Sequence, residues 1–255
     1  MNGSTEFNST GKFYSGISGL VLPVPNKQLY PEEFRDKSRL TYYASLFNSI
    51  EINSSFYKIP QASTVKKWAT EVPEGFRFTF KLWRDITHNK GLVFNPADVD
   101  RFIQVINEVG DKKGCLLIQF PPSLMVANFN QLERLLISIQ DAGSMQQWDV
   151  AVEFRNRSWY TEDVYAMLDT YKAGMVIQDM PASLTPMIDF PTEFVYLRFH
   201  GPNGGYRGTY TDDFLYEYAQ YISDWQQDGK NVYAYFNNTM GEAVKNLMTL
   251  NNYLK

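Results

Sequence analysis

Acidic, basic and histidine side chains recur at the ends of short apolar runs in this sequence. Glu153 and Arg155 end one run two positions apart, and Arg198 and His200 end another with the same spacing. Side chains two positions apart point to the same face of a β-strand. A carboxylate, a guanidinium and an imidazole on shared faces can bind an anion and transfer protons. The spacing therefore predicts a polar site assembled from strand ends.

Four of these side chains are candidates for acid–base catalysis or metal ligation: Glu51, Glu153, Asp179 and His200. The other run ends supply candidate substrate-binding side chains, namely Asn53, Lys81, Gln119, Arg155, Arg198 and Asn237. A guanidinium beside a carboxylate keeps it ionised, which favours an anchoring role for Glu153. The alternative interpretation is a structural network of ion pairs, because such networks also perturb pKa values.

No cofactor can be identified from these residue types. A divalent metal such as Mg²⁺ or Mn²⁺ is compatible with the four catalytic candidates but is not favoured. A cluster of several zinc ions is unfavoured because the chain has only two histidines.

The apolar runs are predicted parallel strands, and amphipathic stretches between them are predicted helices. The predicted strands are 13–18, 48–53, 76–82, 115–120, 148–154, 174–179, 194–200 and 232–237. The predicted helices cover about 33–47, 62–72, 97–110, 128–141, 161–172, 212–228 and 240–254. This alternation predicts an α/β protein, a single (β/α)₈ TIM-type barrel with its site at the C-terminal ends of the strands. Three prolines within 180–193 predict that the sixth crossover helix is short or missing.

Strand alternation also separates the two faces. Glu51, Glu153 and Arg198 lie on the polar face of their strands, whereas residues on the opposite face, such as Ile52 and Val152, are apolar. We expect the polar faces to point toward the interior, where these side chains can pair with one another, because buried polar groups need partners.

The bulk properties indicate one domain over 12–255, preceded by a flexible tail at 1–11. A net charge of −4 argues against a general nucleic-acid binder. No signal peptide or membrane span is predicted, so the expected location is cytoplasmic. The single cysteine, Cys115, excludes an internal disulfide.

Two loops add candidate binding residues. The glycine-rich loop 201–210 follows the seventh predicted strand and carries Arg207, and Asn238 opens the last predicted helix. Loops at these positions of barrels often bind phosphate. Trp159 lies just past a strand end and could stack on a sugar or base; the alternative is packing under the loops.

Several segments together resemble the YecE-like family, also called domain of unknown function 72, over about residues 13–250. They are EINSSFY at 51–57, 81–88, QFPP at 119–122, VEFR at 152–155 with Ser158 and Trp159, HGP at 200–202, YRGTY at 206–210 and YFNN at 235–238. The resemblance implies a TIM-type barrel, distantly like sugar-isomerase and apurinic-endonuclease barrels, and adds Tyr57 and Tyr206 to the binding candidates. The family usually begins with Gly-Thr-Ser-Gly-Trp, whereas this chain has GISGL at 16–20.

These observations predict an enzyme, a hydrolase or isomerase, acting on a small polar anionic substrate that contains phosphate or sugar. The alternatives are a nucleic-acid processing or repair protein, by analogy of fold alone, and a non-catalytic binding module.

Overall fold

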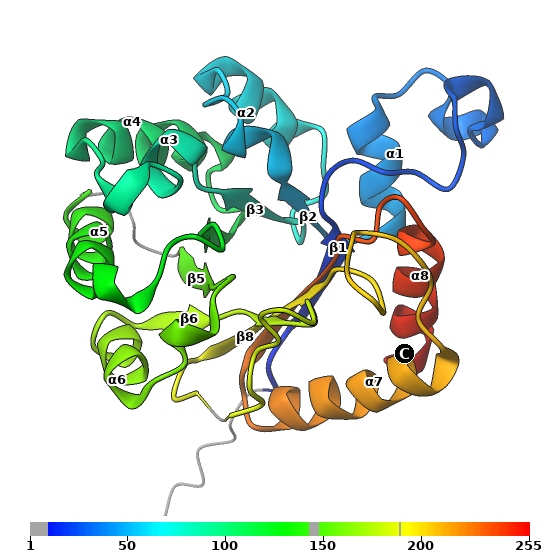
Figure 1. Ribbon diagram of the computed structural model, residues 1–255. Coiled ribbons are helices and arrows are strands. Elements are labelled where there is room, and N and C mark those ends of the chain that lie inside the picture. The colour runs from blue at the N-terminus through cyan, green and yellow to red at the C-terminus, as the bar shows by residue number, and fades with distance from the viewer. Residues whose placement is uncertain (1–9, 143–147, 189) are drawn as a thin grey trace, which may run out of the picture.

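The computed structural model describes residues 10–142, 148–188 and 190–255 and has an α/β fold built on parallel strands (Figure 1). The strands are β1 Phe13–Ile17, β2 Ser49–Ile52, β3 Arg77–Lys81, β4 Lys113–Gln119, β5 Asp149–Glu153, β6 Ala173–Met175, β7 Ile177–Gln178, β8 Phe194–Phe199 and β9 Asn231–Phe236. The α-helices are α1 Arg39–Leu46, α2 Ala62–Thr70, α3 Arg84–Thr87, α4 Pro96–Ile106, α5 Phe129–Asp141, α6 Glu162–Thr170, α7 Asp212–Gln227 and α8 Ala243–Tyr253. Residues 1–9 of the predicted tail lie outside the described residues.

The strands form two parallel sheets, with orders β1-β9-β8-β7 and β2-β3-β4-β5-β6. The sheets meet at two places. Ser18 and Glu51 form an isolated parallel bridge next to β1 and β2, and only Val176 separates β6 from β7. Because every pairing is parallel, the C-terminal ends of the strands gather on one side of the molecule.

The sixth predicted strand is split because a loop residue takes part in its hydrogen bonding. Thr185 Oγ1 donates to the carbonyl of Val176 at 2.9 Å and accepts the Gln178 N–H at 3.2 Å. On the other side, the Val176 N–H donates to the carbonyl of Val152. No helix is assigned in 179–188 or 190–193, as the prolines of this segment predict.

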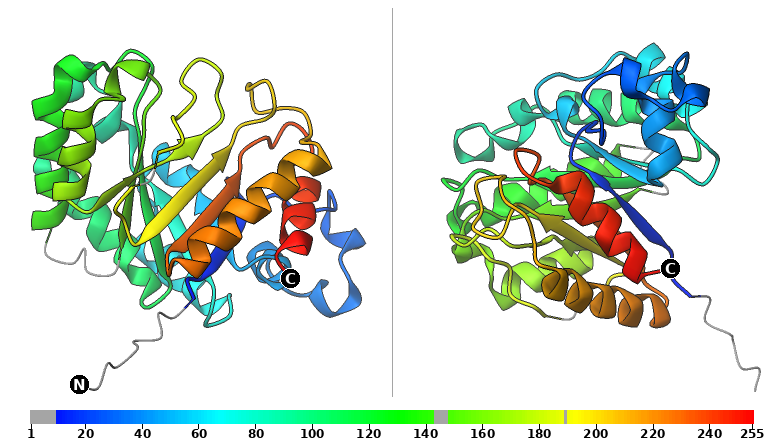
Figure 2. Two further views of the ribbon diagram at one scale, coloured as in Figure 1. Left: turned by 90° about the horizontal axis from the view of Figure 1, so that it is seen from below. Right: turned by 90° about the vertical axis from the view of Figure 1, so that its right-hand side faces the viewer.

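The helices lie around the outside of the strands (Figures 1 and 2). In α4 the buried residues are Val99, Phe102, Ile103 and Ile106, the spacing of one apolar helix face. The predicted helix 33–47 is shorter in the structure: α1 begins after Ser38, whose side chain accepts the Thr41 N–H. Among the described residues, no helix combines the length and apolarity needed to cross a membrane.

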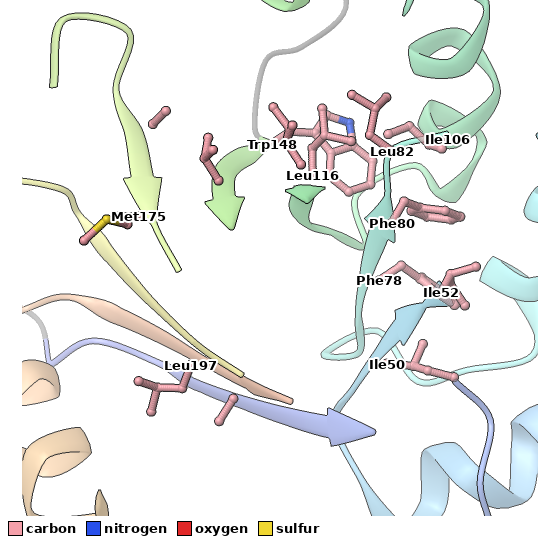
Figure 3. Close-up of a cluster of buried hydrophobic side chains, with 14 of the residues drawn as sticks. Ile50, Ile52, Phe78, Phe80, Leu82, Ile106, Leu116, Trp148, Met175 and Leu197 are labelled. Atoms are coloured by element: carbon pink, nitrogen blue, oxygen red, sulfur yellow. The ribbon is translucent and has the colours of Figure 1, made fainter. Parts of the chain in front are cut away.

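Alternation along the strands divides the core into two layers. The side chains on the strand face predicted to be apolar pack with the surrounding helices. Figure 3 shows Ile50, Ile52, Phe78, Phe80 and Leu197 from this layer. Side chains on the opposite face form a second cluster between the sheets: Tyr14, Cys115, Leu117, Ala151, Val176, Phe194, Tyr196, Tyr233 and Tyr235. The polar candidate residues lie on the same strand face as this second cluster and are therefore positioned inside the molecule.

Candidate functional site

Arg198 is the central residue of the candidate site. Its guanidinium binds Glu51 through two hydrogen bonds, Nη2 to Oε1 at 2.7 Å and Nε to Oε2 at 3.1 Å. Its third nitrogen, Nη1, binds Glu153 Oε2 at 2.7 Å. Arg198 is 1% exposed and both carboxylates are 0% exposed. One buried arginine therefore joins carboxylates from β2 and β5 across the interior, as the sequence predicted in outline.

Each carboxylate oxygen of Glu51 accepts hydrogen bonds from two donors, one of which is Arg198. The Ser18 hydroxyl donates to Oε1, and the Tyr196 hydroxyl donates to Oε2 at 2.6 Å. Burial by itself would raise the pKa of Glu51, but the Arg198 charge and these hydrogen bonds lower it below its ordinary value. Glu51 is thus an ionised, closed anchor and has no free oxygen for proton transfer.

Glu153 links Arg198 to His200 and Arg155. Its Oε1 lies 2.7 Å from Arg155 Nη2 and 2.9 Å from His200 Nε2. Burial opposes ionisation, but the charges of Arg155 and Arg198 hold the pKa of Glu153 well below its usual range. Glu153 therefore remains a carboxylate at neutral pH.

His200 is fully buried, and its ring nitrogens contact Asn237, Glu153 and Arg155. Asn237 Nδ2 lies 3.1 Å from Nδ1, and an amide nitrogen can only donate, so Nδ1 accepts. With the ring proton on Nε2, the ring donates to Glu153, and Arg155 Nη2, which lies 3.1 Å from Nε2 and can only donate, then contacts the ring without a hydrogen bond to it. Burial lowers the pKa of His200 to about 4 although Glu153 favours the charged form. His200 is a neutral donor at physiological pH.

Asp179 lies beside this network and contacts it through the backbone. Its Oδ1 accepts the His200 N–H at 2.7 Å, and its Oδ2 accepts the Tyr210 hydroxyl. Burial raises the pKa of Asp179. Of the four predicted catalytic residues, Glu51, Glu153 and His200 share one network, and Asp179 positions the loop that follows His200.

The side chains nearest the surface form a rim around these carboxylates. Lys81, Gln119, Arg155 and Asn237 are 7–9% exposed, compared with 0–1% for the groups beneath them. Gln119 Nε2 donates to the carbonyl of Phe120 at 2.6 Å. A ligand entering from solvent would therefore meet two cations and two amides first.

Three buried atoms of predicted binding residues have no hydrogen-bond partner in the described residues: Arg155 Nε and Asn53 Oδ1 at strand ends, and Asn238 Oδ1 beside the 201–210 loop. Buried polar atoms in native proteins are usually satisfied, so each such exception indicates an unfilled interaction.

The 201–210 loop folds back over His200. Gly201 has a φ of +103°, and a Cβ there would lie 2.1 Å from the carbonyl oxygen of Arg207. Only glycine fits this position. The Tyr206 ring lies edge-on to the His200 ring, with 5.6 Å between the centroids, and covers one side of the imidazole. Arg207 is exposed on the same loop.

Asn238 braces this loop and does not cap the last helix, which corrects the prediction. Its Nδ2 donates to the carbonyl of Gly208 and to Asn246 Oδ1, both at 3.0 Å. Helix α8 begins at Ala243 instead of near residue 240, so Asn238 is too far from the first turn to cap it.

The structure places Trp159 and Tyr57 outside the network. Trp159 is fully buried, its Nε1 donates to the carbonyl of Leu124, and its ring stacks on Phe154 with 4.9 Å between centroids. This geometry supports packing under the loops and gives no support to stacking on a ligand. Tyr57 is 64% exposed and lines a separate surface cavity with Trp83 and Arg101.

Sequence reasoning left out several residues that hold the site. Tyr196 binds Glu51, and its parity with Arg198 was a usable signal. Ser18 lies in the divergent 16–20 segment and retains the serine of the family motif. The role of Tyr210 depends on a loop fold that the sequence does not specify.

Within the described ranges, no group of three or more His, Cys, Asp or Glu side chains is arranged to hold a metal ion.

Comparison with known proteins identifies relatives along nearly the whole chain. The family model described as "Protein of unknown function DUF72" matches residues 14–255. The UPF0759 protein YunF of Bacillus subtilis is 29% identical over 260 residues, covering 89% of each chain. The UPF0759 protein YecE of Escherichia coli is 24% identical over 123 residues, covering 48% of this chain and 43% of YecE.

Two crystal structures of DUF72 family proteins share the fold. The protein from Thermotoga maritima has a TM-score of 0.78 and 25% identity over 95% of this chain and 99% of its own. The protein from Enterococcus faecalis has a TM-score of 0.74 and 20% identity, covering 95% of each chain. The chain belongs to the DUF72 family.

Proposed function

We propose that this chain is an enzyme that binds a small polar anion, carrying phosphate or a sugar phosphate, at the C-terminal ends of its strands. In this proposal the two sheets act as one (β/α)₈ barrel. The Ser18–Glu51 bridge and the short gap between β6 and β7 support that continuity. Such barrels carry their chemistry at this end.

The observation that carries the proposal is the incomplete pairing of Arg155. Its Nη2 binds Glu153, but its Nε is buried and has no partner within the described ranges. Leaving a buried donor unsatisfied costs about 1–3 kcal/mol. An oxyanion at the rim would accept this hydrogen bond and would lie beside the positive charge of Lys81. The amide of Asn53, which follows β2, would bind a hydroxyl through its unpartnered Oδ1.

The pKa directions favour isomerisation by proton transfer over hydrolysis. Glu51 and Glu153 have lowered pKa values and stay ionised, so neither can protonate a leaving group at neutral pH. The oxygens of Asp179 are both occupied. Lys81 has a pKa of about 7, which suits a group that takes and returns a proton.

The test is a calorimetric titration with inorganic phosphate, followed by an NMR assay for interconversion of aldose and ketose phosphates. We expect saturable binding that weakens at least about tenfold in Arg155→Gln, the effect of losing one hydrogen bond to a charged group. The matched control is Arg35→Gln, an equal charge change at an exposed residue. Equal phosphate affinity in all three proteins would contradict the proposal.

The same assays separate the alternatives. A non-catalytic binding module would bind phosphate through Arg155 and convert no sugar phosphate. A nucleic-acid processing protein would bind a single-stranded oligonucleotide much more tightly than inorganic phosphate, with a steep dependence on salt.

A further inference from the structure

We propose that Lys81 is a catalytic amine that forms an imine with a carbonyl-bearing anionic substrate. The inference deepens the proposed function, because it assumes that the substrate's anionic group is held at Arg155. It adds the substrate class, a small aldehyde or ketone that carries a carboxylate or phosphate, and it changes the role of Lys81 from charge binding to covalent chemistry.

Lys81 differs from the other buried charges of the site in its contacts. Arg198 and Arg155 both pair with carboxylates, at 2.7 Å. Lys81 is 7% exposed, and in the described part of the chain its amine has no hydrogen bond or ion pair. Its contact is with the face of Phe56, where Nζ lies 4.0 Å from the ring centroid. The ring face attracts the ammonium form, whereas removal from water and the lack of a carboxylate partner oppose it, and on balance the neutral amine is favoured.

The surrounding charges act on the pKa of Lys81 in both directions. Burial is the largest influence, and the charges of Arg198 on β8 and Arg155 after β5 also disfavour a third cation, whereas Glu51 on β2 and Glu153 on β5 favour it. His88, which packs against Phe56, is held neutral with a pKa of about 4, in part by Lys81. The resulting pKa of Lys81 is about 7. About half of its amine is then neutral at pH 7, against a small fraction of a percent for an ordinary lysine.

The chemistry follows from a neutral amine next to an anion site. The Nζ lone pair attacks the carbonyl carbon, an N–C bond forms, and the carbonyl oxygen takes up the proton that nitrogen releases. Loss of that oxygen as water, with the second amine proton, leaves the C=N bond. The amine and the carbonyl compound together give the imine and one water, and no oxidant or reductant is needed. The imine withdraws electrons from the adjacent carbon and so promotes proton removal there, which is the step an isomerase requires.

The position of Lys81 fits this role. Lys81 ends β3, its carbonyl accepts a hydrogen bond from the Ser55 hydroxyl at 2.7 Å, and this bond fixes the strand end next to the β2 loop. Arg155 is near enough for its charge to lower the pKa of Lys81. In this proposal the anion of a small substrate is held at Arg155 and its carbonyl meets the amine of Lys81.

The test is reductive trapping with glyoxylate, the smallest aldehyde that carries a carboxylate. The full-length protein is treated at pH 7 with glyoxylate and cyanoborohydride, which reduces an imine to a stable carboxymethyl-lysine, and the sites are found by peptide mass spectrometry. We expect Lys81 to be modified at least about tenfold faster than exposed lysines such as Lys90 and Lys58, because of its larger neutral fraction. Inorganic phosphate should slow the modification of Lys81 and leave the exposed sites unchanged.

The variants separate this inference from the proposed function. Lys81→Met should abolish fast trapping and weaken phosphate binding less than Arg155→Gln does, and Lys90→Met should match the native protein in both assays. Modification of the exposed lysines with Lys81 left unmodified in the native protein would overturn the imine, while phosphate binding that depends on Arg155 would still support the anion site. Fast trapping at Lys81 without phosphate binding would support the amine and contradict the anion site. The peptide map of the native protein decides the question even if a variant fails to fold.

Discussion

The two ends of the strands hold their charges in opposite ways. At the C-terminal ends, Arg198, Glu51 and Glu153 are buried and joined by hydrogen bonds of 2.7–3.1 Å. At the N-terminal ends, charged and polar side chains line an open cavity of about 470 Å³. Its lining residues are Lys12, Tyr14, Arg77, Asp111, Lys113, Asp149, Asn231 and Tyr233.

The difference shows where unpaired groups are informative. Water can solvate the exposed charges of the open N-terminal cavity, such as Lys12 and Asp111, so they need no fixed protein partner, whereas the more buried Asp149 has one in Tyr233. In the closed C-terminal network every ionised group needs a partner, because desolvation costs several kcal/mol per ion. Against that requirement, the Nε of Arg155 is an exception that a ligand would explain, and Lys81, which is 7% exposed, has no carboxylate partner in the described residues. The open cavity at the N-terminal ends is therefore not by itself the better candidate for the active site.

The largest expected effect comes from removing the shared arginine. Arg198→Met leaves Glu51 and Glu153 buried without their main counter-charge, and we expect a loss of about 3–5 kcal/mol in the free energy of unfolding, measured with urea. Arg77→Met at the N-terminal end should cost less than about 1 kcal/mol, because the Arg77 side chain bonds no carboxylate in the described part of the chain; it donates to backbone carbonyls and contacts Tyr14. Similar losses in the two variants would remove the contrast between the two ends.

The next effect has the opposite sign. Lys81→Met replaces a desolvated amine by an apolar side chain of similar length, and we expect a gain of about 1–3 kcal/mol at pH 6. The folded pKa of about 7 lies below the ordinary 10.5, so the unfolded chain binds more protons between these values. The stability of the native protein should therefore rise from pH 7 toward pH 10, and this rise should be absent in the variant. Urea titrations at several pH values measure it, and a destabilised variant at pH 6 would contradict the account.

A smaller effect is expected at the N-terminal cavity. Burial raises the pKa of Asp149 to about 6 although Tyr233 donates a hydrogen bond to it at 2.9 Å. The folded protein then holds its proton more tightly than the unfolded chain, so stability falls as pH rises from about 4 to about 6. Asp149→Asn should remove this fall and gain about 1–2 kcal/mol at pH 7.

Thermal unfolding across this pH range measures the effect. The matched control is Asp111→Asn, which changes an exposed carboxylate of the same cavity. An equal pH dependence in the native protein and in Asp149→Asn would show that Asp149 does not titrate in this range.

The convergence of the site was predictable because two regular features determine it. Alternation places Glu51, Glu153 and Arg198 on one face of their strands, and parallel pairing brings the strand ends together. These are geometric consequences of strand structure and need no tertiary detail. The absence of a helix within the described residues of 179–193 was predictable for a similar reason, because its prolines cannot donate backbone hydrogen bonds.

Other features depended on contacts that no local pattern encodes. That Arg198 is shared between Glu51 and Glu153 follows from distances across the interior. Trp159 follows a strand end, but the sequence does not reveal which layer its ring enters, and the structure buries it against Phe154. The bracing role of Asn238 depends on a loop thirty residues away, at Gly208. Long-range packing decided each of these outcomes.

The most direct test is a crystal structure of the protein soaked in selenate, an anion whose selenium can be located by anomalous scattering. We predict a selenate oxygen within hydrogen-bond distance, about 2.7–3.2 Å, of Arg155 Nε at the C-terminal ends of the strands. Selenate bound only between Lys12 and Arg77 in the N-terminal cavity, with the Arg155 rim empty, would contradict the proposed site.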